Sequence, residues 1–226
     1  MRTRIKICGI TRAGDLAVAV AAGADAIGLV FYPKSARAVT IQQARELLAE
    51  VPPFVSTVGL FVNADVAVVS EAIAELKLDV LQFHGDETAD YCAQFSRPWI
   101  KALRVKSGLN LLEYAARYSG AKGLLLDADV AGFGGGGKAF DWSLIPSEMP
   151  RNFILSGGLT ADNVCDAIRK IRPWAVDVSS GVEASDGNSK GIKDAQKIAQ
   201  FIAAIASADS DLDKETRNHA NAGYTL

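Results

Sequence analysis

The amino-acid sequence predicts a single-domain α/β protein, a closed (β/α)8 barrel of the TIM-barrel type. Three observations support this fold class: a length of 226 residues, eight short apolar segments along the chain, and helical patterns between them. One barrel of this kind typically takes about 250 residues. Apolar residues make up 49% of the chain, which suffices for a large core, and 22% charged residues is ordinary for a globular surface.

The expected strands are continuous or nearly continuous apolar runs, as is typical of strands buried on both faces of a parallel sheet. They are Ile5–Cys8, Ala26–Val30, Thr57–Phe61, Val80–Phe83, Trp99–Leu103, Gly123–Asp127, Asn152–Leu155 and Ala175–Val178. Eight strand–helix repeats of this kind favour a closed barrel. An open doubly wound sheet is the structural alternative.

Helical patterns with recognisable ends lie between these segments. Thr40 and Gln43 have the spacing of a capping box, and an apolar stripe follows them. Thr160 is the expected cap of a later helix, which Pro173 prevents from continuing. A last apolar stripe begins at Ala195.

The pattern predicts one catalytic barrel domain over residues 1–206. Residues 207–226 carry many charged side chains and little apolar content, so we expect a polar C-terminal tail that is mobile or frayed.

The charge balance argues against several classes of partner. Lys and Arg total 24 and Asp and Glu total 26, a net charge of -2. Nucleic acid or an anionic membrane would favour a concentrated basic face, so neither is expected. No apolar run has the length of a membrane span, and the N-terminal segment lacks the apolar core of a signal peptide. A small anionic substrate is compatible, since it needs only a local positive potential.

The three cysteines, Cys8, Cys92 and Cys165, are far apart and lack metal-ligand spacing. We therefore expect free thiols, no metal site and a cytoplasmic protein. Separately, we expect a monomer or a homodimer.

In a barrel of this kind the active site lies at the C-terminal ends of the strands. Cys8 ends the first expected strand and Asp127 the sixth, so the two form a candidate pair of base and acid. The alternative for Cys8 is a buried structural thiol, which is the commoner role of a lone cysteine. The alternatives for Asp127 are a loop cap or a carboxylic acid that burial keeps protonated.

Glycine and serine collect after the last two strands, at Gly158 and at Ser179, Ser180 and Gly181. Glycine lets the backbone approach a ligand closely, and these two loops commonly bind phosphate in this fold. The alternative is a pair of tight turns with no ligand. Because both loops lie on neighbouring strands, the pattern favours a phosphate site.

Three further features lie on the same side. Arg37 follows the second strand and can bind a carboxylate with its forked guanidinium, although a solvated loop arginine is the alternative. His84 follows the fourth strand, where we expect a supporting polar role ahead of an acid–base one. The glycine-rich segment Phe133–Lys138 predicts a lid over bound substrate, or else a long connector. It lacks the strand and helix that surround a P-loop.

These stretches, taken together, resemble the phosphoribosylanthranilate isomerase family. The matching segments are residues 6–11, 28–35 with Arg37, 58–63, 81–85, 126–127, 140–142, 155–159 and 176–183. Each segment is modestly specific, whereas the ordered set, which runs from residue 5 to about 205, is highly specific.

The resemblance implies an isomerase of tryptophan biosynthesis. Its reaction converts N-(5-phosphoribosyl)anthranilate to 1-(2-carboxyphenylamino)-1-deoxyribulose 5-phosphate by an Amadori rearrangement. It implies Asp127 as the general acid that opens the furanose ring, Cys8 as the base at C2, and no metal or organic cofactor. It further implies that Arg37 holds the anthranilate carboxylate. The remaining implied substrate-binding residues are His84, Gly158, Asp177, Ser179, Ser180 and Gly181.

The chain departs from the family pattern in the glycine-rich segment. Gly136 stands where a small hydroxyl residue is usual, and Ala139 where threonine is usual, which concerns loop order and not the chemistry. Two other functions compete. One is another phosphate-binding barrel isomerase, such as the histidine-pathway aminoaldose isomerase, which has aspartate in place of Cys8. The other is a catalytically inactive ligand-binding barrel, against which Cys8 and Asp127 both count.

Overall fold

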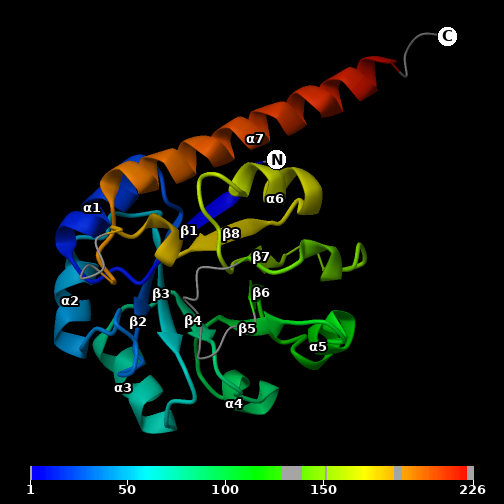
Figure 1. Cartoon of the computed structure of the whole chain (residues 1–226). Helices are drawn as coiled ribbons and strands as arrows, with labels where there is room; N and C mark the ends of the chain where they lie inside the picture. The colour runs from blue at the N-terminus through cyan, green and yellow to red at the C-terminus, as the bar shows by residue number, and fades with distance from the viewer. Residues whose placement is uncertain (1, 129–138, 151, 186–189, 223–226) are drawn as a thin grey trace.

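The eight strands of the protein form a closed parallel barrel in chain order (Figure 1). The computed structural model describes residues 2–128, 139–150, 152–185 and 190–222. The strands are β1 (Arg4–Cys8), β2 (Ala26–Val30), β3 (Ser56–Phe61), β4 (Val80–Phe83), β5 (Trp99–Val105), β6 (Gly123–Ala128), β7 (Ile154–Leu155) and β8 (Ala175–Val178). Because β8 pairs with β1, the sheet has no open edge, and the doubly wound alternative is excluded.

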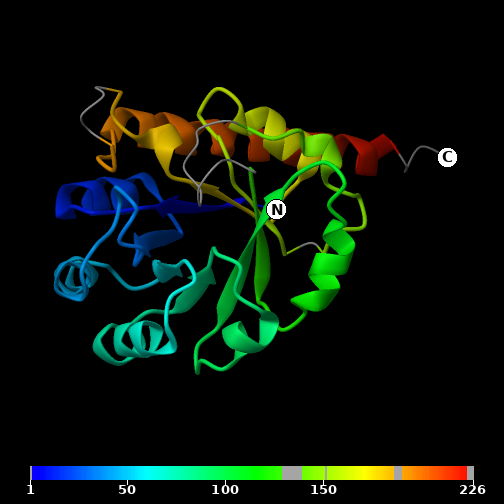
Figure 2. The ribbon, with the colours of Figure 1, turned by 60° about the horizontal axis from the view of Figure 1, so that its bottom comes forward.

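Helices follow the strands and surround the barrel (Figure 2). They are α1 (Ala13–Ala22), α2 (Ile41–Ala49), α3 (Val66–Glu75), α4 (Ala89–Ala93), α5 (Leu111–Arg117), α6 (Val164–Ile171) and α7 (Ala195–Ala222), with short 3-10 helices η1 (Trp142–Leu144) and η2 (Ser180–Val182). The segment Phe133–Lys138, predicted as a lid, and Gly136 lie outside the described residues; Ala139 is described and exposed. None of the helices in the described ranges has the length and apolar character that a membrane span needs.

Of the two predicted helix caps, the one on α2 is confirmed and the one on α6 is wrong. Thr40 accepts a hydrogen bond from the Gln43 backbone at 3.2 Å while the Gln43 side chain accepts from the Thr40 N–H, so the capping box is present. Thr160, by contrast, precedes a turn, and Asn163 is the cap residue of α6. The Asn163 side chain accepts from the Thr160 N–H at 2.9 Å. Sequence spacing alone did not distinguish a cap from the turn before it.

The apolar core lies on both sides of the sheet, because successive strand residues face opposite sides. The larger part lies between the strands and the helices and includes the aromatic pair Phe31 and Phe61, whose rings stack at 5.2 Å. A smaller part fills the barrel interior. Its members are Val80, Ile100, Ala102, Leu125, Ile154 and Ala175. The interior is therefore packed below the end that carries the polar residues.

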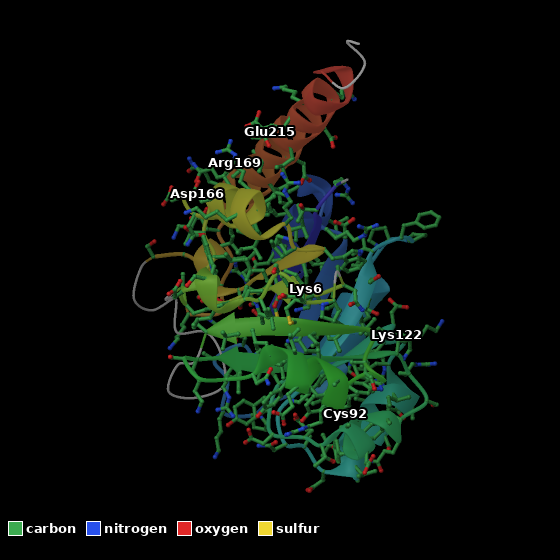
Figure 3. All side chains as sticks on the ribbon, turned by 90° about the vertical axis from the view of Figure 1, so that its right-hand side faces the viewer. Lys6, Cys92, Lys122, Asp166, Arg169 and Glu215 are labelled. Atoms are coloured by element: carbon green, nitrogen blue, oxygen red, sulfur yellow. The ribbon has the colours of Figure 1, made fainter. Side chains whose placement is uncertain are left out.

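The expected boundary at residue 206 is not a structural break. Helix α7 packs against α1 and α6 and continues to Ala222, running beyond the barrel (Figure 1). Asp209 accepts hydrogen bonds from the backbone and hydroxyl of Thr3, both at 2.7 Å. Arg169 on α6 pairs with Asp211 at 2.6 Å, on the side of α6 that faces α7 in Figure 3. Ala208 is buried and Leu212 packs against the core, whereas residues 213–215 are exposed, so the helix leaves the barrel surface only after residue 212.

Candidate active site

The ionisable residues of the barrel mouth occupy inward-facing strand positions. Each stands two positions after another interior residue, and side chains two positions apart on a strand face the same side of the sheet. The pairs are Lys6 and Cys8, Gln82 and His84, Leu125 and Asp127, and Ala175 and Asp177. Figure 3 shows Lys6 among the strands at the centre of the molecule. All four pairs lead to the C-terminal ends of their strands, where this fold places its active sites.

Cys8 shares its surroundings with a buried ion pair. Lys6 Nζ lies 2.8 Å from Asp177 Oδ1, and both side chains are almost wholly buried. The two residues are register partners on β1 and β8, which explains the contact. A Cβ atom on Gly28 of β2 would lie 2.8 Å from Cys8 Sγ and 3.1 Å from Lys6 Nζ. Glycine at position 28 thus makes room for the thiol and the ammonium group together.

The electrostatics of this group act in two directions on the thiol. Burial raises the pKa of Cys8, and the negative charge of Asp177 adds to this, whereas Lys6 and Lys193 lower the pKa. For Lys6 itself, burial opposes the positive charge, but contact with Asp177 and with Cys8 outweighs burial and raises the pKa of Lys6. Lys6 therefore stays charged and favours the thiolate, but burial prevails and the pKa of Cys8 stays above its ordinary value.

Asp127 lies at the other side of the mouth in a hydrogen-bonded chain. Its Oδ2 is 3.0 Å from His84 Nε2, and its Oδ1 accepts from the Ala128 N–H at 2.9 Å. His84 Nδ1 is in turn 3.0 Å from Gln82 Nε2. His84 thus contacts the predicted acid directly, which fits the supporting role expected of it. Asp127 is buried.

Arg37 binds a carboxylate in the structure, and it is that of Glu183. The Nε and Nη2 atoms of Arg37 donate to the two Glu183 oxygens at 2.6 and 2.9 Å. Lys193 donates to the same carboxylate at 3.1 Å and to the carbonyl and hydroxyl oxygens of Ser179 at 3.1 and 3.3 Å. Burial favours the neutral form of Glu183, yet the hydrogen bonds from Arg37 and the charge of Lys193 outweigh it, so the pKa of Glu183 is lowered.

The two glycine-containing loops of the expected phosphate site touch each other. Gly158 has a φ of 65°, a left-handed conformation that favours glycine, and its carbonyl accepts from the Asn163 side chain at 2.9 Å. A Cβ atom on Gly181 would lie 1.9 Å from the Leu159 carbonyl oxygen. Ser180 begins the 3-10 helix η2 directly after β8. The loops after β7 and β8 therefore form one continuous rim.

The opposite side of the mouth, on β2 and β3, is apolar. Val30, Leu60 and Val62 form a buried cluster with Cys8, and Tyr32 packs against it. A flat apolar wall of this kind suits an aromatic ring, since such a ring is stabilised by burial against aliphatic side chains.

Sequence reasoning missed five residues of this site: Lys6, Gly28, Gln82, Glu183 and Lys193. A signal existed for Lys6 and Gln82, because each stands two positions before a predicted site residue on the same strand. Glu183 and Lys193 lie after β8 and before α7, and no local pattern marks them. No cluster of His, Cys, Asp and Glu that could hold a metal ion occurs in the described part of the chain.

A closed barrel with ionisable groups collected at one end of its strands defines a (β/α)8-barrel enzyme. The model of the N-(5'-phosphoribosyl)anthranilate (PRA) isomerase family matches residues 5–204 of the chain. A relative from Dechloromonas aromatica (strain RCB) with that activity in its name is 60% identical over 212 residues, which are 94% of this chain and 100% of the relative. Another from Thiobacillus denitrificans is 61% identical over 203 residues, 89% of this chain and 97% of the relative. The chain belongs to the PRA isomerase family.

Solved structures agree with this assignment. The crystal structure of phosphoribosyl anthranilate isomerase from Thermotoga maritima has a TM-score of 0.81 and 41% identity, covering 91% of this chain and 99% of that one. A structure of such an isomerase in complex with reduced 1-(o-carboxyphenylamino)-1-deoxyribulose 5-phosphate has a TM-score of 0.78 and 39% identity, with coverage of 91% and 99%. Family membership decides against a different phosphate-binding barrel isomerase.

Proposed function

We propose that Cys8 and Asp127 carry out, as base and acid, the Amadori rearrangement that defines PRA isomerase activity in tryptophan biosynthesis. The substrate is N-(5-phosphoribosyl)anthranilate and the product 1-(2-carboxyphenylamino)-1-deoxyribulose 5-phosphate. The observation that carries the proposal is the placement of a thiol beside a buried ammonium group and of a buried carboxyl group at the same end of one barrel.

The reaction needs one acid and one base and balances within the substrate. Asp127 gives its proton to the furanose ring oxygen, the C1–O bond breaks, and the nitrogen lone pair forms a C1=N Schiff base. Cys8, as thiolate, removes the proton from C2; the C2–H electron pair forms C1=C2, and the C1=N pair returns to the nitrogen to give an enolamine. In the ketonisation the Cys8 thiol gives its proton to C1 and the C2 hydroxyl group gives its proton to the Asp127 carboxylate, so both side chains regain their starting states.

The charge of Lys6 supports the base in this scheme. A thiol in an apolar site stays protonated, because burial disfavours the thiolate. The Lys6 ammonium group, held by Asp177 at 2.8 Å, offsets part of this effect next to the sulfur, so the thiolate forms more readily than burial alone would allow. Asp177 accordingly acts through Lys6, and we propose that role for it ahead of direct contact with substrate.

The remaining groups orient the substrate. Glu183 occupies the Nε–Nη2 edge of Arg37, and the second edge of the guanidinium fork is the one proposed to bind the anthranilate carboxylate. The apolar wall of β2 and β3 takes the aromatic ring. The rim of Gly158, Ser179, Ser180 and Gly181 takes the phosphate.

Two substitutions test the assignment of acid and base. Asp127→Asn keeps the size and a hydrogen-bond donor but cannot deliver a proton, so we expect normal binding of the reduced product analogue and a turnover loss of about 10²- to 10⁴-fold. Cys8→Ser should lose turnover to a similar extent. The matched control is Cys165→Ser, since Cys165 lies on α6 with its sulfur on the Ala204 carbonyl oxygen, away from the barrel mouth.

Turnover is followed by the loss of the substrate's anthranilate-type fluorescence. An Asp127→Asn variant that binds poorly and yet turns over at the normal rate would make Asp127 a positioning residue, with His84 the next candidate acid. A Cys8→Ser variant with normal turnover would remove Cys8 from the mechanism.

We further propose a cytoplasmic protein that is a monomer or a homodimer. Free Cys8, Cys92 and Cys165 suit a reducing compartment. Fully exposed Phe54 and half-exposed Trp174 border a cavity of about 360 Å³ at the N-terminal end of the barrel, a face suited to a second copy. Sedimentation of the parent and of Phe54→Ser decides between monomer and homodimer, because only a dimer through this face dissociates in the variant.

A further inference from the structure

Gln82 on β4 has a buried amide oxygen without a partner. The side chain is 0% exposed, its Nε2 lies 3.0 Å from His84 Nδ1, and its Oε1 has no hydrogen-bond partner in the described part of the molecule. A buried carbonyl oxygen left without a donor loses its hydrogen bonds to water and gains none in return, which destabilises the folded state. An amide held in this position at such a cost needs a reason.

The orientation of this amide fixes the direction of the whole hydrogen-bonded chain. The Gln82 amino group can only donate, so His84 Nδ1 accepts and the imidazole proton is on Nε2. His84 Nε2–H then donates to Asp127 Oδ2, while the Ala128 N–H donates to Oδ1. Two donors on the two oxygens stabilise Asp127 as a carboxylate, which is the wrong form for an acid.

A half-turn of the Gln82 amide about its Cγ–Cδ bond reverses this direction. Its oxygen then accepts from His84 Nδ1–H, and the His84 Nε2 lone pair faces an Asp127 Oδ2 that carries the proton. The two states differ by one proton: carboxylate, Nε2–H imidazole and a proton from solvent give carboxylic acid and Nδ1–H imidazole. The same turn gives the oxygen a partner and moves the amino group to the unpartnered position, so neither orientation satisfies the whole amide and both stay accessible.

We propose that Gln82 is a positioning residue whose amide orientation selects the tautomer of His84 and thereby switches Asp127 between carboxylate and acid. This inference rests on the proposed role of Asp127 as the acid. Substrate brings a phosphate and a carboxylate to the barrel mouth, and nearby negative charge favours uptake of a proton by a carboxylate. The acid state therefore forms when substrate binds.

Nitrogen-15 NMR of the histidine ring tests the proposal directly, because ring-nitrogen shifts distinguish the two tautomers. The chain has two histidines, His84 and His219, so a His219→Gln background leaves one set of ring signals. We expect the Nε2–H tautomer in the free protein and the Nδ1–H tautomer when the reduced product analogue is bound. The same Nε2–H tautomer in both states would overturn the proposal.

Gln82→Met removes the amide at similar volume. We expect the variant to keep the Nε2–H tautomer even with the analogue bound, and to lose at least about tenfold in kcat with little change in KM, a part of what general acid catalysis supplies. The control is Leu125→Met, a buried interior residue of β6 whose apolar side chain forms no hydrogen bond; this variant should show the parent tautomer shift.

Normal kcat in a folded Gln82→Met variant would overturn the proposal, and if this variant fails to fold, the two spectra of the parent decide alone. The proposed acid has a separate test. Normal turnover in Asp127→Asn would refute the acid, whereas the tautomer of the parent is measured without turnover.

Discussion

Substitution in the buried pair of Lys6 and Asp177 tests how much this ion pair contributes to the stability of the barrel. In Lys6→Met, Asp177 keeps its charge and loses the partner that lies at 2.8 Å. Both side chains are only 5–6% exposed, so solvent does not screen the loss. Breaking a buried pair by removing one partner typically costs about 3–5 kcal/mol. At roughly 2–4 °C per kcal/mol for a chain of this size, Tm should fall by about 6–20 °C.

Asp177→Asn should cost less stability than Lys6→Met, because Lys6 retains the Cys8 sulfur as a neighbour. The two variants should also shift the pKa of the Cys8 thiol in opposite directions. Lys6 lowers the pKa of Cys8 and Asp177 raises it, so Lys6→Met raises this pKa further and Asp177→Asn lowers it. The double variant removes both charges and should recover part of the stability lost in Lys6→Met.

Thermal unfolding measures the stability changes, and thiolate absorbance near 240 nm follows the titration of Cys8. The other two thiols must not contribute to this absorbance. Cys165→Ser is therefore added to every variant, and Cys92 does not interfere well below pH 12 because burial raises its pKa to about 12. The reasoning is refuted if the two variants shift the Cys8 titration in the same direction, or if Lys6→Met costs less than about 1 kcal/mol.

Three further perturbations probe the rim, the arginine and the pH response. Gly181→Ala should force the two loops apart, since its Cβ meets a carbonyl oxygen at 1.9 Å, and weaken competitive inhibition by inorganic phosphate; unchanged inhibition would place the phosphate elsewhere. Gly14→Ala, with nothing within 4 Å, is its control and should add about 0.5–1 kcal/mol to helix stability. Glu183→Gln should raise KM about 10- to 100-fold with a smaller effect on kcat, because Arg37 loses the carboxylate that fixes its orientation; an unchanged KM would contradict this. Burial raises the pKa of Cys92 to about 12, above the value of about 8.5 for an unfolded thiol. The stabilisation that comes from keeping this thiol protonated is therefore fully present below about pH 8.5, and it is lost as the pH rises toward 12. Urea unfolding between these pH values should show a slope of about 1.4 kcal/mol per pH unit that Cys92→Ala reduces.

Much of the fold was predictable because strand burial leaves a strong local signal. All eight strands agree with the expected segments to within two residues at each end. The capping box at Thr40 was predictable because its signal is also local: Thr40 and Gln43 lie within one helical turn. Helix α7 past residue 206 was not, because its last contacts with the barrel are the scattered residues Ala208, Asp209 and Leu212, and beyond them the helix needs no apolar stripe.

The sequence by itself determined the barrel, the end of the barrel where we propose the chemistry, and the residues that stand at the strand ends. Strand periodicity is local, and the carboxyl ends of parallel strands meet at one rim, so Cys8 and Asp127 share that rim whatever the details. Only the tertiary structure decided their partners. Lys6 meets Asp177 across the β1–β8 closure, and Arg37 meets Glu183 from 146 residues away. Contacts between strands distant in sequence depend on register and barrel closure, which no short window of sequence encodes.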